Sequence, residues 1–300
     1  MSESAQSPDQ ALIAPADSRI TRRGWIARTW RVLRKAPPTA WFGLIVIGVY
    51  LFVAIFAPML APYPETDLVG GAFEPWGGKF VLGTDQLGRD MLSRLIFGAR
   101  NSVGIALVTT VLSFTIGSTL GLVAAISKGW IDQVLGRFVD VLMSIPQLIF
   151  ALVLLSIVGS SIPNLILIIA VLDSTRVFRL SRSVAQGVVV MDYVEAARLR
   201  GEKLPWIMRR EILPNIMAPL VAEFGLRFCF VFLTISALSF LGLGIQPPTA
   251  DWGSMVRDNA ALITYGDVTP LLPAGAIALL TVAMNFVVDW FLHKTSGLRE

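Results

Sequence analysis

The sequence predicts an all-α protein that crosses a membrane six times. Three observations predict this fold class: 54% of the 300 residues are hydrophobic and only 15% are charged, apolar runs of spanning length recur along the chain, and Lys and Arg gather in alternate loops. A chain with so little polar material cannot cover a soluble globule of this size. A hydrocarbon core of roughly 30 Å needs about 20 apolar residues per helix, and the mean hydropathy of +0.68 fits such helices.

The N-terminal residues differ in composition from the rest of the chain. Residues 1–18 are rich in Ser, Ala, Gln, Asp and Pro without apolar periodicity, so they are predicted to form a disordered cytoplasmic tail. Residues 19–38 carry seven Lys or Arg around Ile26, Trp30 and Leu33. This spacing predicts a basic interfacial helix that lies on the membrane surface.

Six apolar segments are predicted to span the membrane. They are residues 41–60, 102–126, 138–159, 163–175, 217–244 and 270–291. The first is too long, and begins too far from residue 1, to be a cleavable signal peptide. The second carries Ser113, Gly117 and Gly121 at four-residue spacing, which lets another helix approach closely. Before it, Leu92, Leu95, Ile96 and Ala99 can form an interfacial helix that leads into the bilayer.

Polar residues interrupt the third and fourth segments. In the third, Ser144 and Gln147 lie beside Pro146, and a proline frees backbone groups that neighbours or water must satisfy. The resulting kink could border a wet path or be a plain packing kink, and both interpretations stand. Asp173 and Arg176 close the fourth segment, although its helix can continue toward residue 182.

The distribution of positive charge orients the predicted spans. One side, made of residues 1–38, 128–137, 176–210 and 294–299, collects 19 of the 25 Lys and Arg residues. The other side holds five in residues 61–101 and 245–269. Because cytoplasmic loops carry the excess of Lys and Arg, the richer side is predicted to be cytoplasmic, together with both termini.

The sequence argues against several kinds of site. The single cysteine, Cys229, excludes an internal disulfide framework, and the single histidine, His293, follows the last apolar segment as a boundary residue. Asp85 and Asp90 suit turns and helix caps better than a metal site, because no histidine or third carboxylate joins them. No GxxxxGK[ST] motif occurs, so the chain is not expected to bind ATP through a P-loop. No catalytic residue, metal or nucleic-acid partner is predicted.

A polar stretch at residues 191–215 has its own helix punctuation. Asp192 can cap a first helix, with Glu195 three residues on as in a capping box, and Gly201 fits a C-terminal stop. A second helix can begin near Pro205 and is expected to end before Pro214. Two short helices are therefore predicted to meet at a glycine.

These residues resemble the EAA loop of bacterial ABC importer permeases. The matching residues are Glu195, Ala196, Ala197 and Gly201, followed by Leu213 and Pro214. Glu211 departs from the pattern, which favours an apolar residue there. Residues 82–100 and 247–255 are similar to the dipeptide and oligopeptide (and nickel) branch, in particular to its second membrane subunit.

The resemblance implies a type I ABC importer permease architecture over residues 39–300. It implies exterior loops at 61–101 and 245–269 and a cytoplasmic coupling loop at 178–216. It also implies a non-catalytic subunit in a bacterial inner membrane, paired with a sister permease, two ATPases that bind ATP and Mg, and an extracytoplasmic solute-binding protein. Di- or oligopeptides are the expected solutes; a nickel complex, an opine or an oligosaccharide is the alternative.

Two sets of candidate functional residues follow. The residues expected to couple the chain to an ATPase are Glu195, Ala196, Ala197, Arg198, Arg200 and Gly201. Those expected in a translocation path or a subunit interface are Ser144, Gln147, Glu223 and Arg227. Glu223 and Arg227 are four residues apart and can pair on one helix face. A secondary transporter is the rival from another class, but it would show two similar halves or paired acidic residues in mid-membrane.

Overall fold

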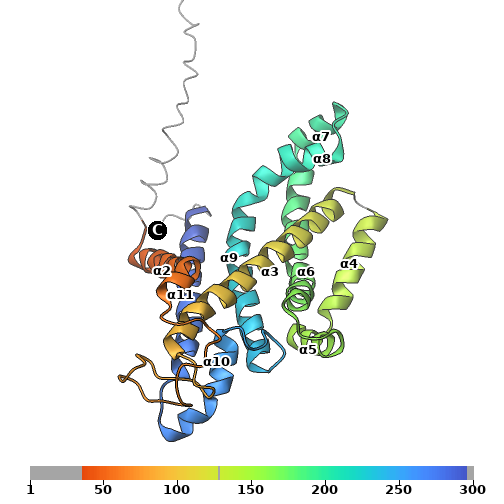
Figure 1. Cartoon of the computed structure of the whole chain (residues 1–300). Helices are drawn as coiled ribbons and strands as arrows, with labels where there is room; N and C mark the ends of the chain where they lie inside the picture. Colours follow the sequence, from red (N-terminus) through yellow and green to blue (C-terminus); the bar gives the residue numbers. More distant parts are fainter. Residues whose placement is uncertain (1–35, 128, 296–300) are drawn as a thin grey trace, which may run out of the picture. The chain divides into compact units, whose positions relative to one another are not determined.

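A computed structural model describes residues 36–127 and 129–295, and the predictions for residues 1–18 and for most of 19–38 lie outside these residues. The chain divides into two units, residues 1–37 and residues 38–300, and the second contains the helices described below (Figure 1). They are α2 (Pro38–Leu60), α3 (Met91–Ser127), α4 (Trp130–Met143), α5 (Gln147–Val158), α6 (Ile162–Val189), α7 (Asp192–Leu199), α8 (Leu204–Ile207), a π-helical turn (Met208–Ile212), α9 (Leu213–Phe240), α10 (Trp252–Asn259), a 3-10 helix (Ala260–Tyr265) and α11 (Leu271–Thr295). The described residues contain no β-strand, which confirms the all-α prediction.

Within the described residues, four helices are long and apolar enough to cross a membrane. The segments are α2, α3, residues 204–240 and α11, and a fifth is reached if the bent pair α4 and α5 is one span. The 28-residue α6 is not among them, because it contains Asp173, Arg176, Arg179 and Arg182. The fourth apolar segment was expected to be the weakest, and its helix continues through these charges to Val189.

Two helix boundaries differ from those predicted in extent, although the helix before the second span and the interruption at Pro146 are both present. The expected interfacial helix at 92–99 and the second span are one continuous helix, α3, of 37 residues. The expected kink in the third span is a break, because α4 and α5 meet at an angle of 85°. Pro146 has no N–H to donate and disfavours helical geometry in the residue before it, so α4 ends at Met143 and α5 begins after the proline.

Small residues let α3 and α6 pack closely, as their spacing predicts. A Cβ atom on Gly117 would lie 2.5 Å from the backbone oxygen of Ser174, and one on Gly121 would lie 2.7 Å from that of Phe178. Ser113, one turn earlier, is fully buried. Backbone contact of this kind requires glycine at the crossing.

Trp252 anchors the segment 245–269 to the helices. Its side chain is 2% exposed, packs edge-on against Tyr50 and Phe232, and donates from Nε1 to the carbonyl oxygen of Leu95 at 3.0 Å. Residues 252–259 of this expected loop form α10. Figure 1 shows α10 at one end of the helical unit and α7 with α8 at the opposite end.

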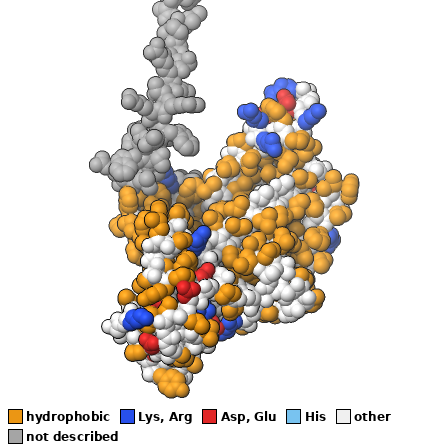
Figure 2. Space-filling view, in the orientation of Figure 1, with side chains coloured by type: hydrophobic (Ala, Val, Ile, Leu, Met, Phe, Trp, Pro, Cys, Tyr) orange, Lys and Arg blue, Asp and Glu red, His pale blue; other side chains and the backbone are white. Residues whose placement is uncertain are grey.

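Apolar side chains cover much of the helical surface. On α2, Ile45, Phe52, Ile55 and Met59 are between 54% and 82% exposed. Figure 2 shows hydrophobic side chains over the helices, with Lys and Arg gathered at the tip that carries α7 and α8. An apolar belt of this extent is typical of a surface that contacts lipid.

Candidate functional site

The short helix α7 begins without the predicted capping box. Its N-cap residue is Met191, and no side chain caps it. The backbone N–H groups of Val194 and Glu195 instead donate to the carbonyl oxygen of Met191, at 3.0 and 3.3 Å. Asp192 and Glu195 still lie in the first turn, where negative charge interacts favourably with the helix dipole.

The predicted glycine stop is confirmed. Gly201 has a φ of +80°, and its N–H donates to the carbonyl oxygen of Arg198 at 2.9 Å while that of Glu202 donates to Ala197 at 3.2 Å. These bonds satisfy carbonyl groups at the end of α7. A glycine adopts this left-handed conformation without the penalty that a Cβ atom brings.

The predicted end of the second helix before Pro214 is wrong. The chain passes from α8 through the π-helical turn directly into α9, and Pro214 lies in the first turn of α9. A proline is tolerated there because the first N–H groups of a helix have no intrahelical partner. The predicted coupling element, α7 and α8, is therefore continuous with the long helix α9.

A buried apolar cluster fixes this coupling element to three long helices. Val194 and Ala197 of α7 are fully buried, and Ile207 and Ile212 contribute from the following residues. The cluster is completed by residues of α3, α6 and α9, namely Leu122, Ala125, Ile126, Ala185, Val189, Ile216 and Leu220. Because packed cores deform little, α7 is held as part of the helical unit.

The opposite face of the element is exposed and mixed in character. Leu199 is 81% exposed, and Tyr193 and Trp206 are also exposed. The predicted coupling residues Glu195, Ala196, Arg200 and Gly201 lie on the surface, Arg198 is half-buried, and Ala197 points into the cluster described above. Arg200 approaches Glu211 at 3.9 Å, so the residue that departs from the EAA pattern contributes an ion pair within the element.

A buried charge cluster joins α6 to α9. The predicted pair of Glu223 and Arg227 is confirmed, with 2.8 Å between Oε1 and Nε. Asp173 of α6 completes the cluster at 3.6 Å from Nη1 of Arg227, and Ser113 donates to its Oδ2 at 2.9 Å. Asp173 was expected to close a span, yet it is 1% exposed. The sequence contained one signal for this contact: Asp173 carries the charge opposite to that of Arg227, the lone arginine of the fifth apolar segment.

The Arg227 guanidinium lies over the ring of Phe230, with 4.7 Å from Cζ to the centroid. Oδ1 of Asp173 and both Nε and Nη1 of Arg227 have no hydrogen-bond partner among the described residues, so Arg227 meets both carboxylates through ion pairs. The contact between Asp173 and Arg227 is an ion pair at a distance longer than a hydrogen bond, in a setting of low dielectric constant.

The other two predicted path residues lie at the break between α4 and α5. The hydroxyl of Ser144 donates to the carbonyl oxygen of Val141 at 2.7 Å. Gln147 lines a cavity of about 120 Å³ together with Thr175 and Arg176. Neither has a recorded bond to Glu223 or Arg227, so the four residues form two separate groups.

The acidic residues before α3 have turn and cap roles. Oδ1 of Asp85 accepts hydrogen bonds from the backbone N–H groups of Leu87 and Arg89, at 2.9 and 3.0 Å. Oδ2 of Asp90 accepts from the N–H and the hydroxyl of Ser93, at 2.8 and 2.6 Å. These bonds give Asp85 and Asp90 the turn and cap roles that the sequence predicts. Oδ2 of Asp85 also accepts from Nε of Arg89 at 2.7 Å and lies 3.3 Å from Nε of Arg94.

Asp251 is the N-cap residue of α10. Its Oδ2 accepts from the N–H of Ser254 at 2.9 Å, and its Oδ1 accepts from the hydroxyl of Ser102 at 2.8 Å. Burial raises the pKa of the Asp251 carboxyl, and these hydrogen bonds oppose that change. The carboxyl thus ties α10 to α3.

Comparison with known proteins agrees with this arrangement. Residues 117–294 match the family described as binding-protein-dependent transport system inner membrane component. Residues 24–73 match the N-terminal transmembrane domain of oligopeptide transport permease C. A crystal structure of an amino acid ABC transporter with histidines has a TM-score of 0.50 at 18% identity, over 68% of this chain and 94% of that chain, and shows the same fold.

Several curated proteins are more similar in sequence. The di/tripeptide transport system permease protein DppC of Pseudomonas aeruginosa is 37% identical over 86% of this chain and 85% of its own length. The dipeptide permease DppC of Alkalihalophilus pseudofirmus is 36% identical, over 86% and 83%. The glutathione permease GsiD of Pectobacterium atrosepticum is 31% identical, over 90% and 88%. The chain belongs to the inner membrane components of binding-protein-dependent transport systems, and is a permease of the ABC importer type.

Proposed function

We propose that this chain forms half of a translocation path for dipeptides and pairs with a sister permease. The observation that carries the proposal is the similarity to permeases named for dipeptides and di/tripeptides, at 32% to 37% identity over most of the chain. The described residues offer no group of three His, Cys, Asp or Glu that could hold a metal ion. Nickel complexes, opines and oligosaccharides are the other solutes to be tested.

Six spans with both termini in the cytoplasm form part of the proposal. The spans are α2, α3, the bent pair α4 and α5, α6, α9 and α11. Three charges of α6 support its place among them, because Asp173 pairs with Arg227, Arg179 with Asp140, and Arg182 with Asp132. Charged side chains within a span usually pair in this manner. The excess of Lys and Arg supports the orientation.

The coupling element is proposed to bind a cytoplasmic ATPase subunit. Its exposed residues combine apolar side chains, such as Leu199 and Tyr193, with the charged Glu195 and Arg200. Such a surface suits a protein partner. The buried cluster below it would transmit a displacement of α7 to α9 as movement of one body. ATP and Mg would be bound by the partner, and a solute-binding protein would dock on exterior loops 61–101 and 245–269.

The test uses the complex purified through a tag on this chain and reconstituted in lipid vesicles. We expect ATPase subunits to co-purify, and a dipeptide with its binding protein to stimulate ATP hydrolysis and to enter the vesicles. Glutathione is the informative competitor, because one relative is named for it. Uptake of another solute in place of dipeptides would contradict the substrate assignment. Transport by the isolated chain along an ion gradient would favour a secondary transporter.

A further inference from the structure

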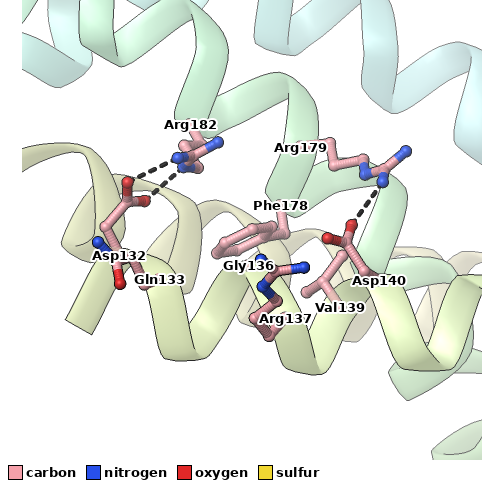
Figure 3. A pocket seen from close by; sticks show the side chains of 9 residues that line it. All are labelled: Asp132, Gln133, Gly136, Arg137, Val139, Asp140, Phe178, Arg179 and Arg182. Carbon is pink, nitrogen blue, oxygen red and sulfur yellow. Dashed lines mark hydrogen bonds and ion pairs between the residues drawn. The ribbon is translucent and has the colours of Figure 1, made fainter. Parts of the chain in front are cut away.

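The helices α4 and α6 enclose a charged pocket of about 510 Å³ (Figure 3). Its charged lining residues are Asp132, Arg137, Asp140, Arg179 and Arg182. Two ion pairs join the helices across it. Nη2 of Arg182 lies 2.6 Å from Oδ2 of Asp132, and Nη2 of Arg179 lies 2.6 Å from Oδ1 of Asp140.

The two ion pairs differ in how far a ligand could reach them. The side chains of Arg179 and Asp140 are 55% and 52% exposed, whereas those of Arg182 and Asp132 are 35% and 18% exposed. Phe178 lies between the pairs (Figure 3) and is buried, as is Val139. The pocket therefore has an apolar floor, one half-buried ion pair and one exposed ion pair.

Arg137 adds a positive charge to the lining. Its side chain is exposed, and neither of the pocket's two ion pairs, among the residues that the structure describes, includes it. The five charged residues of the pocket, three arginines and two aspartates, leave a net charge of +1. A ligand with a carboxylate would meet a donor that the fold does not use.

The faces of α4 indicate that the pocket holds water rather than lipid tails. Trp130, Val134, Phe138 and Val141 are between 57% and 73% exposed and follow one stripe of the helix. The pocket side of α4 carries the polar and charged residues. Ionisable side chains in a membrane helix usually face the protein interior or a water-filled cavity. The apolar stripe of α4 thus suits lipid or protein, and its polar side suits an aqueous path.

We propose that this pocket, most of whose charged residues lie in segments predicted to be cytoplasmic, is a binding site for a small zwitterionic peptide at the cytoplasmic end of the translocation path. The inference rests on the dipeptide function proposed above. Arg137 and Arg179 would bind the terminal carboxylate, and Asp140 would bind the terminal ammonium group. The exposed pair of Arg179 and Asp140 exchanges its internal contact for contacts with the two ends of the ligand. The half-buried pair of Arg182 and Asp132 keeps its contact, and the apolar floor receives a peptide side chain.

The same chemistry, an ammonium group joined to an anion, also occurs in the headgroup of phosphatidylethanolamine. Binding measured in nanodiscs of different lipid composition distinguishes a peptide site from a headgroup site. In nanodiscs of phosphatidylcholine alone, a peptide site keeps its affinity for a dipeptide. A headgroup site would show dipeptide binding that falls as phosphatidylethanolamine is added, and this result would overturn the assignment to peptide.

The test measures equilibrium binding of radiolabelled alanyl-phenylalanine to the whole permease and ATPase complex in nanodiscs, without binding protein or nucleotide. We expect Arg137→Gln to weaken dipeptide binding by about tenfold, since a charge-assisted contact is lost. The same change should leave binding of the C-terminal amide unaltered, because the amide carries no carboxylate. Asp140→Asn should weaken dipeptide binding while leaving that of the N-acetylated dipeptide unaltered.

The matched control is Arg100→Gln. It removes an exposed arginine that does not line the pocket. It should bind the dipeptide like the wild type. Equal affinity of Arg137→Gln and wild type, or no dipeptide binding by a wild-type complex that does transport dipeptides, would overturn the inference alone. Failure of the wild type to transport any dipeptide with its binding protein would instead overturn the proposed function.

Discussion

Arg227 lies between two carboxylates, and the two contacts differ in strength. The contact with Glu223 belongs to its own helix and has hydrogen-bond length, whereas the contact with Asp173 crosses between helices at 3.6 Å. Desolvation of a buried charge is compensated only by its partners. Arg227 therefore supplies a compensating charge for the buried aspartate on α6.

Arg227→Gln is predicted to destabilise the chain by about 3 to 5 kcal/mol, because it leaves Asp173 buried without a compensating charge. Asp173→Asn should have a smaller effect, since Arg227 keeps its ion pair with Glu223. The midpoint of thermal unfolding in detergent measures both. Adding Asp173→Asn to Arg227→Gln should restore part of the lost stability. A fully stable Arg227→Gln single variant would show that the cluster does not stabilise the packing of α6 on α9.

Gly201→Val is predicted to lower stability by about 1 to 2 kcal/mol through backbone strain alone. A Cβ atom would meet nothing within 4 Å, but the φ of +80° disfavours a β-branched residue. Gly201→Asn is the control, because asparagine tolerates the left-handed region. If the turn also couples ATP hydrolysis to transport, the valine variant should transport less per ATP hydrolysed than the asparagine variant. Equal stability and equal coupling ratios of the two would count against both roles.

Two adjacent alanines of α7 lie on different faces of the helix. Ala197 is fully buried in the chain's own cluster, and Ala196 is exposed. We expect Ala197→Leu to destabilise the chain by about 1 to 3 kcal/mol through overpacking. Ala196→Leu should leave the unfolding midpoint unchanged but reduce the amount of ATPase subunit that co-purifies. Normal ATPase recovery with Ala196→Leu would place the partner on another face.

The crossing of α3 and α6 depends on backbone contact, so Gly117→Val should disrupt it. The added Cβ atom would lie 2.5 Å from a backbone oxygen that cannot move aside, and we expect a loss of about 1 to 3 kcal/mol or more. Gly104→Ala on the same helix is the matched control, since nothing lies within 4 Å of its Cβ position. Unfolding of both variants in one detergent gives the comparison. A stable Gly117→Val variant would mean that α6 can shift without penalty.

At the scale of the whole molecule, the orientation can be tested by labelling cysteines. In a Cys229→Ala background, Gly78→Cys lies in the predicted exterior loop and Lys203→Cys in the coupling element, and both positions are exposed. A membrane-impermeant maleimide added to intact spheroplasts should label the first residue and reach the second only after permeabilisation. The reverse pattern would place α7 and α8 outside the cell and remove them from any cytoplasmic ATPase.

Hydropathy was sufficient to locate most of the long helices, because an apolar run of spanning length forms few structures other than a membrane helix. It could not show where helices continue or break. Asp173 and Arg176 read as the end of a span, yet their helix continues because Asp173 is paired in the tertiary structure. The break at Pro146 is larger than the expected kink, and its angle depends on packing rather than on local sequence.

The candidate sites show the same division. Gly201 and the pair of Glu223 with Arg227 are local in sequence, and the structure has both as expected. The pocket of α4 and α6 joins residues some 40 to 50 positions apart. No local pattern of the sequence joins its polar residues, because only the packing of α4 against α6 brings them together.

The π-helical turn at Met208–Ile212 fixes how α9 is rotated about its own axis relative to α7 and α8. A helix advances about 100° per residue, so deletion of one residue there would turn every later side chain of α9 by more than a quarter of a revolution. Arg227 would then face away from Asp173. The number of residues between Gly201 and α9 thus sets the rotational phase of α9, and with it the face that α9 presents to α6.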